Sequence, residues 1–454
     1  MAGQNQQQRN LTLDFFRGLA LLIIFINHIP ANELLFFTPS RYGLSDAAEI
    51  FVFLSGYAAA IAYGRSFRTA GLWLGSVRVF HRCAQIYGAH LFLFMLLAVI
   101  CVLGNTVFGE PDYIHRLNIR YFFDDTQEAL LGLVSLRYVP NYFDILPMYL
   151  VVMLWIPVVW GLSRIHLALA LAFPVGVYTA MWQYGLELSA DLHSDRPWFF
   201  NPFGWQLMFF TGFAFGSGWL KPPQHGPWLA AMCVSFVILV LPLGPEPALR
   251  PTEFLIQLHA TLQPLLDKTH FGPLRLVHFL ALAYLVTMFL RNREHWLQSR
   301  LAKAIIQMGQ QSLPIFIVTM ALSYVGGMML DQFGHGVAVL AAVNLGGCVF
   351  LLLTGSGMAW LKSAPWERYG AHEALSATSS DRESGSFSSA LAAWPGRLKH
   401  APAMVLASVV AAVPLLMSEK TASAHHSLVA MRGTNGISAQ DRVVDSKNEH
   451  PNIK

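Results

Sequence analysis

The feature that most limits how this chain can fold is a series of apolar segments, each of them long enough to cross a lipid bilayer. About 20 apolar residues, at a rise of about 1.5 Å each, span a bilayer core of about 30 Å. Of the 454 residues, 54% are hydrophobic and only 12% are charged. Soluble domains carry about 25% charged residues. We therefore expect an all-α polytopic membrane protein.

Ten apolar segments qualify as membrane spans. They cover residues 11–30, 47–63, 86–104, 144–162, 165–184, 203–219, 228–243, 274–290, 312–330 and 337–361. Arginine and lysine collect in the connections after the second and eighth segments, whereas acidic residues collect in the alternate connections. The positive-inside rule then predicts a cytoplasmic N-terminus. No small-residue cleavage site follows the first segment, so we expect a retained span rather than a signal peptide.

The two longest outer connections, 105–142 and 244–273, are long enough to suggest a functional role. The character of the chain changes after the membrane domain, residues 1–362. Residues 363–400 are rich in serine, so we expect a disordered linker. Residues 401–454 contain an apolar run at 401–417 and a polar tail. That run is either an eleventh span or an interfacial segment.

The first apolar segment carries ionisable residues at membrane depth. Arg17 and His28 are eleven positions apart, so they share one helix face at a separation of roughly 16 Å. Asp14 lies one turn before Arg17, close enough to pair with it. Such groups cost about 2.5–3.5 kcal/mol each and usually face a bundle interior or a wet cavity. The alternative is an ion pair near the headgroups, with His28 at the far interface.

The second apolar segment begins with two carboxylates on one helix face, Asp46 and Glu49. The hairpin between the first two segments brings both to the membrane depth of His28. A carboxylate bonded to one imidazole nitrogen leaves the other nitrogen as a base. The alternative is that the two acids only stabilise a helix start. Deeper in this segment, Ser55 is either a packing residue or a hydroxyl contact to substrate.

A cluster of arginines follows the second segment: Arg65, Arg68, Arg78 and Arg82. Its simplest role is to set topology and to contact lipid headgroups. The alternative is a phosphate clamp for a cytoplasmic cofactor, because the arginine fork matches phosphate oxygens. A phosphorylated donor entering from the cytoplasm would meet Arg17 on the way to His28.

Composition also argues against several other classes of protein. The net charge of +4 is small and no basic block is present, so we expect no nucleic-acid partner. The four cysteines have no CxxC spacing and mostly fall in apolar runs, which is typical of buried packing residues. The histidine and cysteine spacings suggest no metal site.

Two motifs carry a resemblance to a known family. LDFFRGLALLIIFINH, followed by EIFVFLSGY, resembles the membrane acyltransferase-3 superfamily. The chain is more closely similar to the OpgC family, which modifies osmoregulated periplasmic glucans with succinyl groups. NYFDILPMYLVVML at 141–154 and GQQSLPIFIVTM at 309–320 also resemble later spans of that family. The resemblance covers about residues 10–362.

This resemblance implies an acyl-CoA donor, with succinyl-CoA as the expected form, and an acceptor sugar hydroxyl outside the cytoplasm. It implies an essential histidine at His28 and a partner basic residue at Arg17. The wider superfamily often ends a late span with a histidine after a Ser-Tyr-Pro-like start. Here the corresponding stretch has Ser312, Leu313 and Pro314 and then Thr319, so that element is not carried over.

The leading hypothesis is a multi-pass O-acyltransferase of the bacterial inner membrane with no tightly bound cofactor. His28, oriented by Glu49 or Asp46, would deprotonate a glucan hydroxyl. Arg17 and the arginine cluster would hold the phosphates of CoA, and Asn27 or Ser55 would donate to the oxyanion. The expected partners are an envelope saccharide, membrane lipid and the glucan synthesis machinery.

Three alternatives stay open at this point. One is an acetyltransferase that acts on another envelope polysaccharide or on a lipid. Another is a transporter or flippase for saccharide, with Asp14, Arg17 and His28 as an ion path. The third is a structural membrane partner of a glucan synthase.

Overall fold

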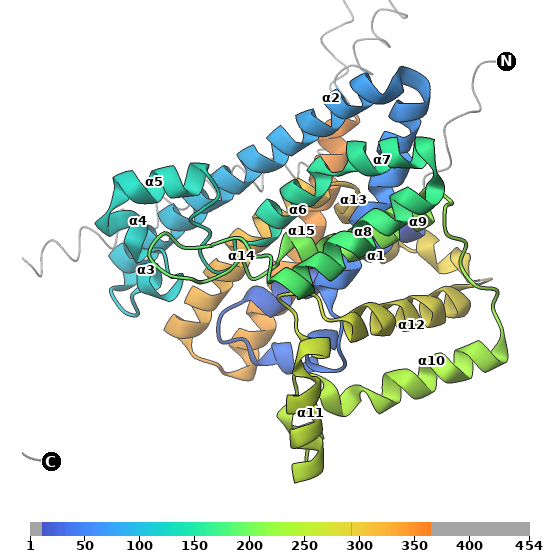
Figure 1. Cartoon of the computed structure of the whole chain (residues 1–454). Helices are drawn as coiled ribbons and strands as arrows, with labels where there is room; N and C mark the ends of the chain where they lie inside the picture. The colour runs from blue at the N-terminus through green and yellow to red at the C-terminus, as the bar shows by residue number, and fades with distance from the viewer. Residues whose placement is uncertain (1–10, 292, 365–454) are drawn as a thin grey trace, which may run out of the picture. The chain divides into compact units, whose positions relative to one another are not determined.

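The computed structural model describes residues 11–291 and 293–364, which fold almost entirely into helices (Figure 1). These residues contain no β-strand, and one isolated β-bridge joins Ser189 to Pro197. The predicted all-α class is therefore confirmed. The expected serine-rich linker, from residue 365 onward, and the apolar run at 401–417 lie outside the described residues.

The first half of the chain forms α1 (Leu11–His28), η1 (Glu33–Phe37), η2 (Pro39–Arg41), α2 (Ala47–Phe108), α3 (Tyr113–Arg116), α4 (Arg120–Asp124), α5 (Thr126–Val134), α6 (Ile145–Leu154), α7 (Ile156–Ile165), α8 (Leu167–Tyr184) and α9 (Pro202–Gly216). The second half forms α10 (Pro227–Leu239), η3 (Leu241–Leu243), η4 (Pro247–Leu249), α11 (Glu253–Leu266), α12 (Pro273–Leu290), η5 (Glu294–Gln298), α13 (Arg300–Gln310), α14 (Ser312–Phe333) and α15 (Val337–Lys362).

Seven stretches of helix in the described residues are long and apolar enough to cross a membrane. They are Leu11–His28, Ala47–Phe108, Ile145–Ile165, Leu167–Tyr184, Pro273–Leu290, Ser312–Phe333 and Val337–Lys362. Each of the ten predicted segments falls on a helix. However, α9 has 15 residues and α10 has 13, so both are short for a bilayer. The number of spans stays a prediction.

The second and third predicted segments belong to one 62-residue helix, α2, which is interrupted at Gly71. Gly71 has φ +79°, a left-handed value that favours glycine. The chain reverses there, as Figure 1 shows, and the two arms of α2 touch. Nη1 of Arg78 donates to the carbonyl oxygen of Ala62 at 3.2 Å. Thus a single glycine converts one long helix into a hairpin.

Glycines let pairs of helices pack backbone against backbone. A Cβ atom added to Gly309 on α13 would lie 1.8 Å from the carbonyl oxygen of Asp14 on α1. A Cβ added to Gly56 on α2 would lie 1.9 Å from the carbonyl oxygen of Phe209 on α9. Small residues at these crossings are typical of helices packed within membranes.

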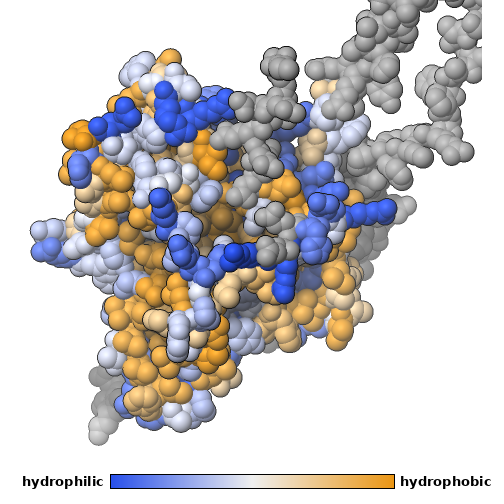
Figure 2. Space-filling model, turned by 90° about the vertical axis from the view of Figure 1, so that its right-hand side faces the viewer, coloured by the Kyte–Doolittle hydropathy of each residue, from blue (hydrophilic) through white to orange (hydrophobic). Residues whose placement is uncertain are grey.

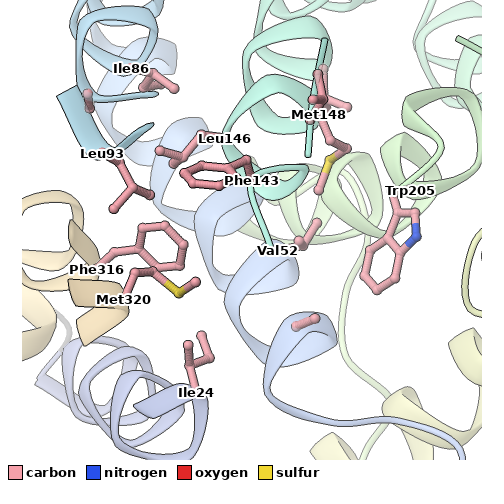
Figure 3. Packing of buried hydrophobic residues seen from close by; sticks show 14 of the residues in the cluster. Ile24, Val52, Ile86, Leu93, Phe143, Leu146, Met148, Trp205, Phe316 and Met320 are labelled. Atoms are coloured by element: carbon pink, nitrogen blue, oxygen red, sulfur yellow. The ribbon is translucent and has the colours of Figure 1, made fainter. Parts of the chain in front are cut away.

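Apolar side chains from several helices fill the interior. Ile24 of α1 lies near Phe316 and Met320 of α14, and Val52 of α2 points toward Met148 of α6; all five are almost fully buried (Figure 3). Hydrophobic residues also cover much of the outer face seen in Figure 2. On α10 the apolar side chain of Trp228 is 84% exposed.

Candidate active site

A cavity of about 570 Å³ opens at the end of the bundle where α1 ends and where α2, α6 and α12 begin. Both long outer connections contribute to its wall, Tyr142 at the end of one and Lys268 in the other. The polar residues of the wall are Asn27, His28, Ser40, Arg41, Ser45, Asp46, Asn141, Tyr142, Asp144, Lys268 and Arg275. The cavity thus joins residues that are more than 200 positions apart in the chain.

His28, the last residue of α1, faces this cavity. Its Nδ1 atom lies 2.8 Å from the carbonyl oxygen of Ile24. A carbonyl oxygen only accepts hydrogen bonds, so Nδ1 carries the proton in the neutral ring and Nε2 is left as the basic nitrogen. The ring also contacts Tyr142 edge to face, with the ring centres 5.6 Å apart.

In this structure Asp46 and Glu49, expected to orient His28, hydrogen-bond to other groups. Asp46 caps α2 by accepting from the backbone N–H of Ala48 at 2.8 Å, and Glu49 accepts from the backbone N–H of Asp46 at 2.8 Å. This reciprocal pair is a capping box. A backbone carbonyl, rather than a carboxylate, sets the tautomer of His28.

Both carboxylates are also bound by cations from the far half of the chain. Nζ of Lys268 pairs with Asp46 at 2.5 Å, and Nε of Arg275 donates to Glu49 at 2.7 Å. Burial opposes ionisation of Asp46, but Lys268 and Arg275 hold the pKa of this carboxyl below its ordinary value. Glu49 is completely buried, so Arg275 is the group that compensates its charge.

Asp144 is a further carboxyl group on the cavity wall. Its side chain is 3% exposed. The Oδ1 atom of Asp144 accepts from the N–H of Phe199 at 2.9 Å. The cavity wall therefore includes a buried carboxyl group that is held by a backbone N–H group.

Of the two expected oxyanion donors, Asn27 lies on the cavity wall and Ser55 is not among the lining residues. The amide of Asn27 donates to Ser40, and its oxygen accepts from Thr38 at 2.8 Å. Ser55 is 2% exposed and lies two turns into α2. This arrangement favours Asn27 over Ser55 as a group that meets a ligand.

Arg17 and His28 each contact a residue from another part of the chain. Arg17 donates to the hydroxyl of Ser312 on α14, and its charge acts on the hydroxyl of Tyr149 on α6. Tyr142, seven positions before Tyr149, contacts His28. His28 therefore contacts the connection before α6, whereas Arg17 is held by α14.

The family model described as OpgC protein matches residues 9–363. The chain belongs to the OpgC family. No curated protein and no solved structure is detectably similar to it. Membership in the OpgC family implies an acyltransferase-type function in glucan modification. The OpgC match includes every residue of the cavity wall.

The four arginines expected to clamp phosphate lie along the α2 hairpin, and none of them lines the cavity of this OpgC protein. The guanidinium group of Arg68 lies 6.0 Å from the ring centre of Trp160, and that of Arg78 lies 5.8 Å from that of Tyr63. Arg65 is exposed, and Arg82 donates to Gln85 at 2.9 Å. Asp14 is 4% exposed, beside the crossing of α1 and α13.

The OpgC cavity includes residues that sequence reasoning missed, namely Tyr142, Asp144, Lys268 and Arg275. One signal for Arg275 was present, because a cation in the first turn of the apolar segment 274–290 marks a functional site or a partner. The spacing Asp46-Ala-Ala-Glu49 also matches a capping box. Nothing local in the sequence pointed to Tyr142 or Lys268 as neighbours of His28.

Proposed function

We propose that this protein is an O-acyltransferase of the bacterial inner membrane, with its N-terminus in the cytoplasm. It transfers an acyl group, succinyl by family resemblance, from acyl-CoA to a hydroxyl of a periplasmic glucan. The observation that carries this proposal is the hydrogen bond from Nδ1 of His28 to Ile24 at 2.8 Å. That bond leaves Nε2 as a base on the wall of a polar cavity.

The chemistry needs one proton transfer in each direction. Nε2 of His28 takes the proton of the sugar hydroxyl as its oxygen attacks the thioester carbonyl carbon. The tetrahedral intermediate then collapses, the carbon–sulfur bond breaks, and the thiolate of CoA takes the proton back from the imidazolium. Lys268 and Asn27 are the cavity-wall groups proposed to stabilise the oxyanion.

Donor binding is assigned to the opposite half of the membrane domain. Arg17 lies within α1, about 16 Å along the helix from His28. The exposed arginines of the α2 hairpin, Arg65, Arg68 and Arg78, are proposed to bind the phosphates of CoA, because arginine binds phosphate oxygens through paired donors. In this arrangement the acyl end passes Arg17 and reaches His28. The proposed surroundings are membrane lipid, a glucan acceptor and the glucan synthesis machinery.

The test uses purified protein in lipid nanodiscs with succinyl-CoA and a glucan acceptor. Wild-type protein should release CoA thiol and yield acylated glucan, as read by thiol titration and mass spectrometry. His28→Ala should abolish both, whereas His335→Ala, which removes an exposed histidine after α14, should not. Acylation at the wild-type rate by a folded His28→Ala variant would overturn the proposal. Glucan movement across vesicles without thiol release would favour a transporter instead.

A further inference from the structure

A second cavity, of about 130 Å³, adjoins the first. Its walls come from the end of α1, from α3 and from α14. The lining residues are Pro30, Tyr113, Arg116, Tyr142, Tyr324, Gly327, Met328 and Asp331. Tyr142 lines both cavities, so one ligand can extend from the first into the second across this ring. The second cavity is small enough to hold only one part of such a ligand.

Tyr142 occupies an unusual backbone position for a bulky side chain. Its φ is +74°, a left-handed value that tyrosine rarely adopts. The side chain is 47% exposed although its ring contacts His28. Strained residues that the surrounding structure holds in place cluster at ligand sites. The conformation places an exposed aromatic face beside the proposed base.

The polar groups of the second cavity suit a neutral polyhydroxylated ligand. Arg116 and Asp331 form an ion pair at 2.5 Å, so together they add no net charge. The side chain of Arg116 is 43% exposed, which keeps donors available at the cavity mouth. Tyr113 and Tyr324 are almost fully buried and form apolar walls. Aromatic walls with a few fixed donors and acceptors match the apolar faces and hydroxyl rim of a sugar ring.

We propose that Tyr142 and the second cavity form a saccharide subsite next to the reacting sugar. This inference rests on the proposed function and specifies where the glucan acceptor binds relative to His28. One sugar ring enters the second cavity between Tyr324 and the Arg116–Asp331 pair. The adjoining ring lies on Tyr142, which brings one of its hydroxyls toward His28.

The experiment measures equilibrium binding of laminarihexaose, a neutral gluco-oligosaccharide, to protein in nanodiscs without acyl-CoA. Tyr142→Asn tolerates the left-handed backbone but removes the ring, and it should weaken binding about tenfold. Tyr142→Phe keeps the ring and should bind within about twofold of wild type. Asp331→Asn should also weaken binding. The control Tyr184→Asn removes a tyrosine that is 71% exposed at the end of α8 and should change nothing.

The subsite is overturned if Tyr142→Asn binds the oligosaccharide as tightly as wild type, or if Tyr142→Phe loses as much binding as Tyr142→Asn. It is also overturned if binding depends on the anionic lipid content of the nanodisc rather than on the oligosaccharide. Melting temperatures in detergent identify variants that fail to fold. Oligosaccharide binding that depends on Tyr142 in a protein that transfers no acyl group would support the subsite and reject the proposed function.

Discussion

Nδ1 of His28 lies 2.8 Å from the carbonyl oxygen of Ile24, one turn earlier on α1. The helix that carries the histidine therefore also sets its tautomer, because a backbone carbonyl accepts only from a protonated ring nitrogen. No carboxylate is needed for this task, and the two carboxylates nearby are bound to Lys268 and Arg275.

The substitution His28→Asn distinguishes the role of Nδ1, which bonds to Ile24, from the role of Nε2, the proposed base. The asparagine amide keeps a donor for Ile24 but has no counterpart of Nε2. Acyl transfer should fall about 10²–10⁴-fold, the usual contribution of a general base, while the melting temperature stays close to wild type. Single-turnover acylation and thermal unfolding in detergent check both parts. A fully active His28→Asn protein would show that Nε2 is not the base.

Glu49→Gln should destabilise the protein because it leaves Arg275 buried without a countercharge. Glu49 is 0% exposed and the side chain of Arg275 is 8% exposed. Removing one partner of such a pair costs about 3–5 kcal/mol. Replacing both together, Glu49→Leu with Arg275→Met, should recover most of that loss. Unfolding by SDS, followed by circular dichroism, measures the two differences, and equal stability of the single and double variants would contradict the pairing argument.

Gly309→Ala should disturb the crossing of α1 and α13. A Cβ there would lie 1.8 Å from the carbonyl oxygen of Asp14 and 2.9 Å from the backbone nitrogen of Gly18, on either side of Arg17 in the sequence. We expect a loss of about 1–3 kcal/mol and a higher KM for acyl-CoA, since Arg17 must move with α1.

Gly346→Ala, on α15, is the matched control for that substitution. A Cβ at Gly346 meets nothing within 4 Å, so the change should be neutral or should add up to about 1 kcal/mol of stability. Equal melting temperatures for the Gly309→Ala variant and wild type would reject backbone contact at this crossing.

Stability should depend on pH through His270, which lies between α11 and α12. Its Nδ1 lies 2.5 Å from Asp267 and its Nε2 lies 2.6 Å from Glu187. Burial lowers the pKa of His270, but the hydrogen bonds to Glu187 and Asp267 outweigh it, so the pKa is raised above 6.5. A group with a raised pKa contributes its full stability below its unfolded pKa and loses it as pH rises through the folded value.

The melting temperature of the wild-type protein should therefore fall as pH rises above about 6.5, and His270→Gln should flatten this dependence. The control His335→Gln should leave the wild-type slope unchanged. Parallel slopes for the His270→Gln variant and wild type would show that the Glu187–His270–Asp267 contact does not contribute to stability.

Much of the fold could be predicted because its signals are local. An apolar run of about 20 residues has few structures in which to satisfy its backbone in lipid, so each of the ten segments became helical. The boundaries between spans were harder to predict. Gly71 looks like any other glycine in the sequence, yet its left-handed φ makes 47–63 and 86–104 the arms of one hairpin.

Sequence reasoning could place candidate residues that lie on one helix. It could not identify contacts between residues of different helices. Arg17 and His28 share a face because of the helical period alone. The roles of Asp46 and Glu49 depended on which cations reach them, and those cations arrive from 222 and 226 residues away. The periodicity of the sequence around Asp46 and Glu49 does not predict these contacts with Lys268 and Arg275.

The amino-acid sequence by itself determined that this chain is helical and membrane-embedded, that it belongs to the OpgC family, and that Arg17 and His28 lie on one side of α1. Those properties follow from hydrophobic length, helical period and local motifs. Only the tertiary structure decided that Tyr142 contacts His28 and that Lys268 and Arg275 bind the two acids. Such contacts depend on the packing of remote segments, because the partner of a buried charge is chosen by three-dimensional proximity rather than by spacing along the chain.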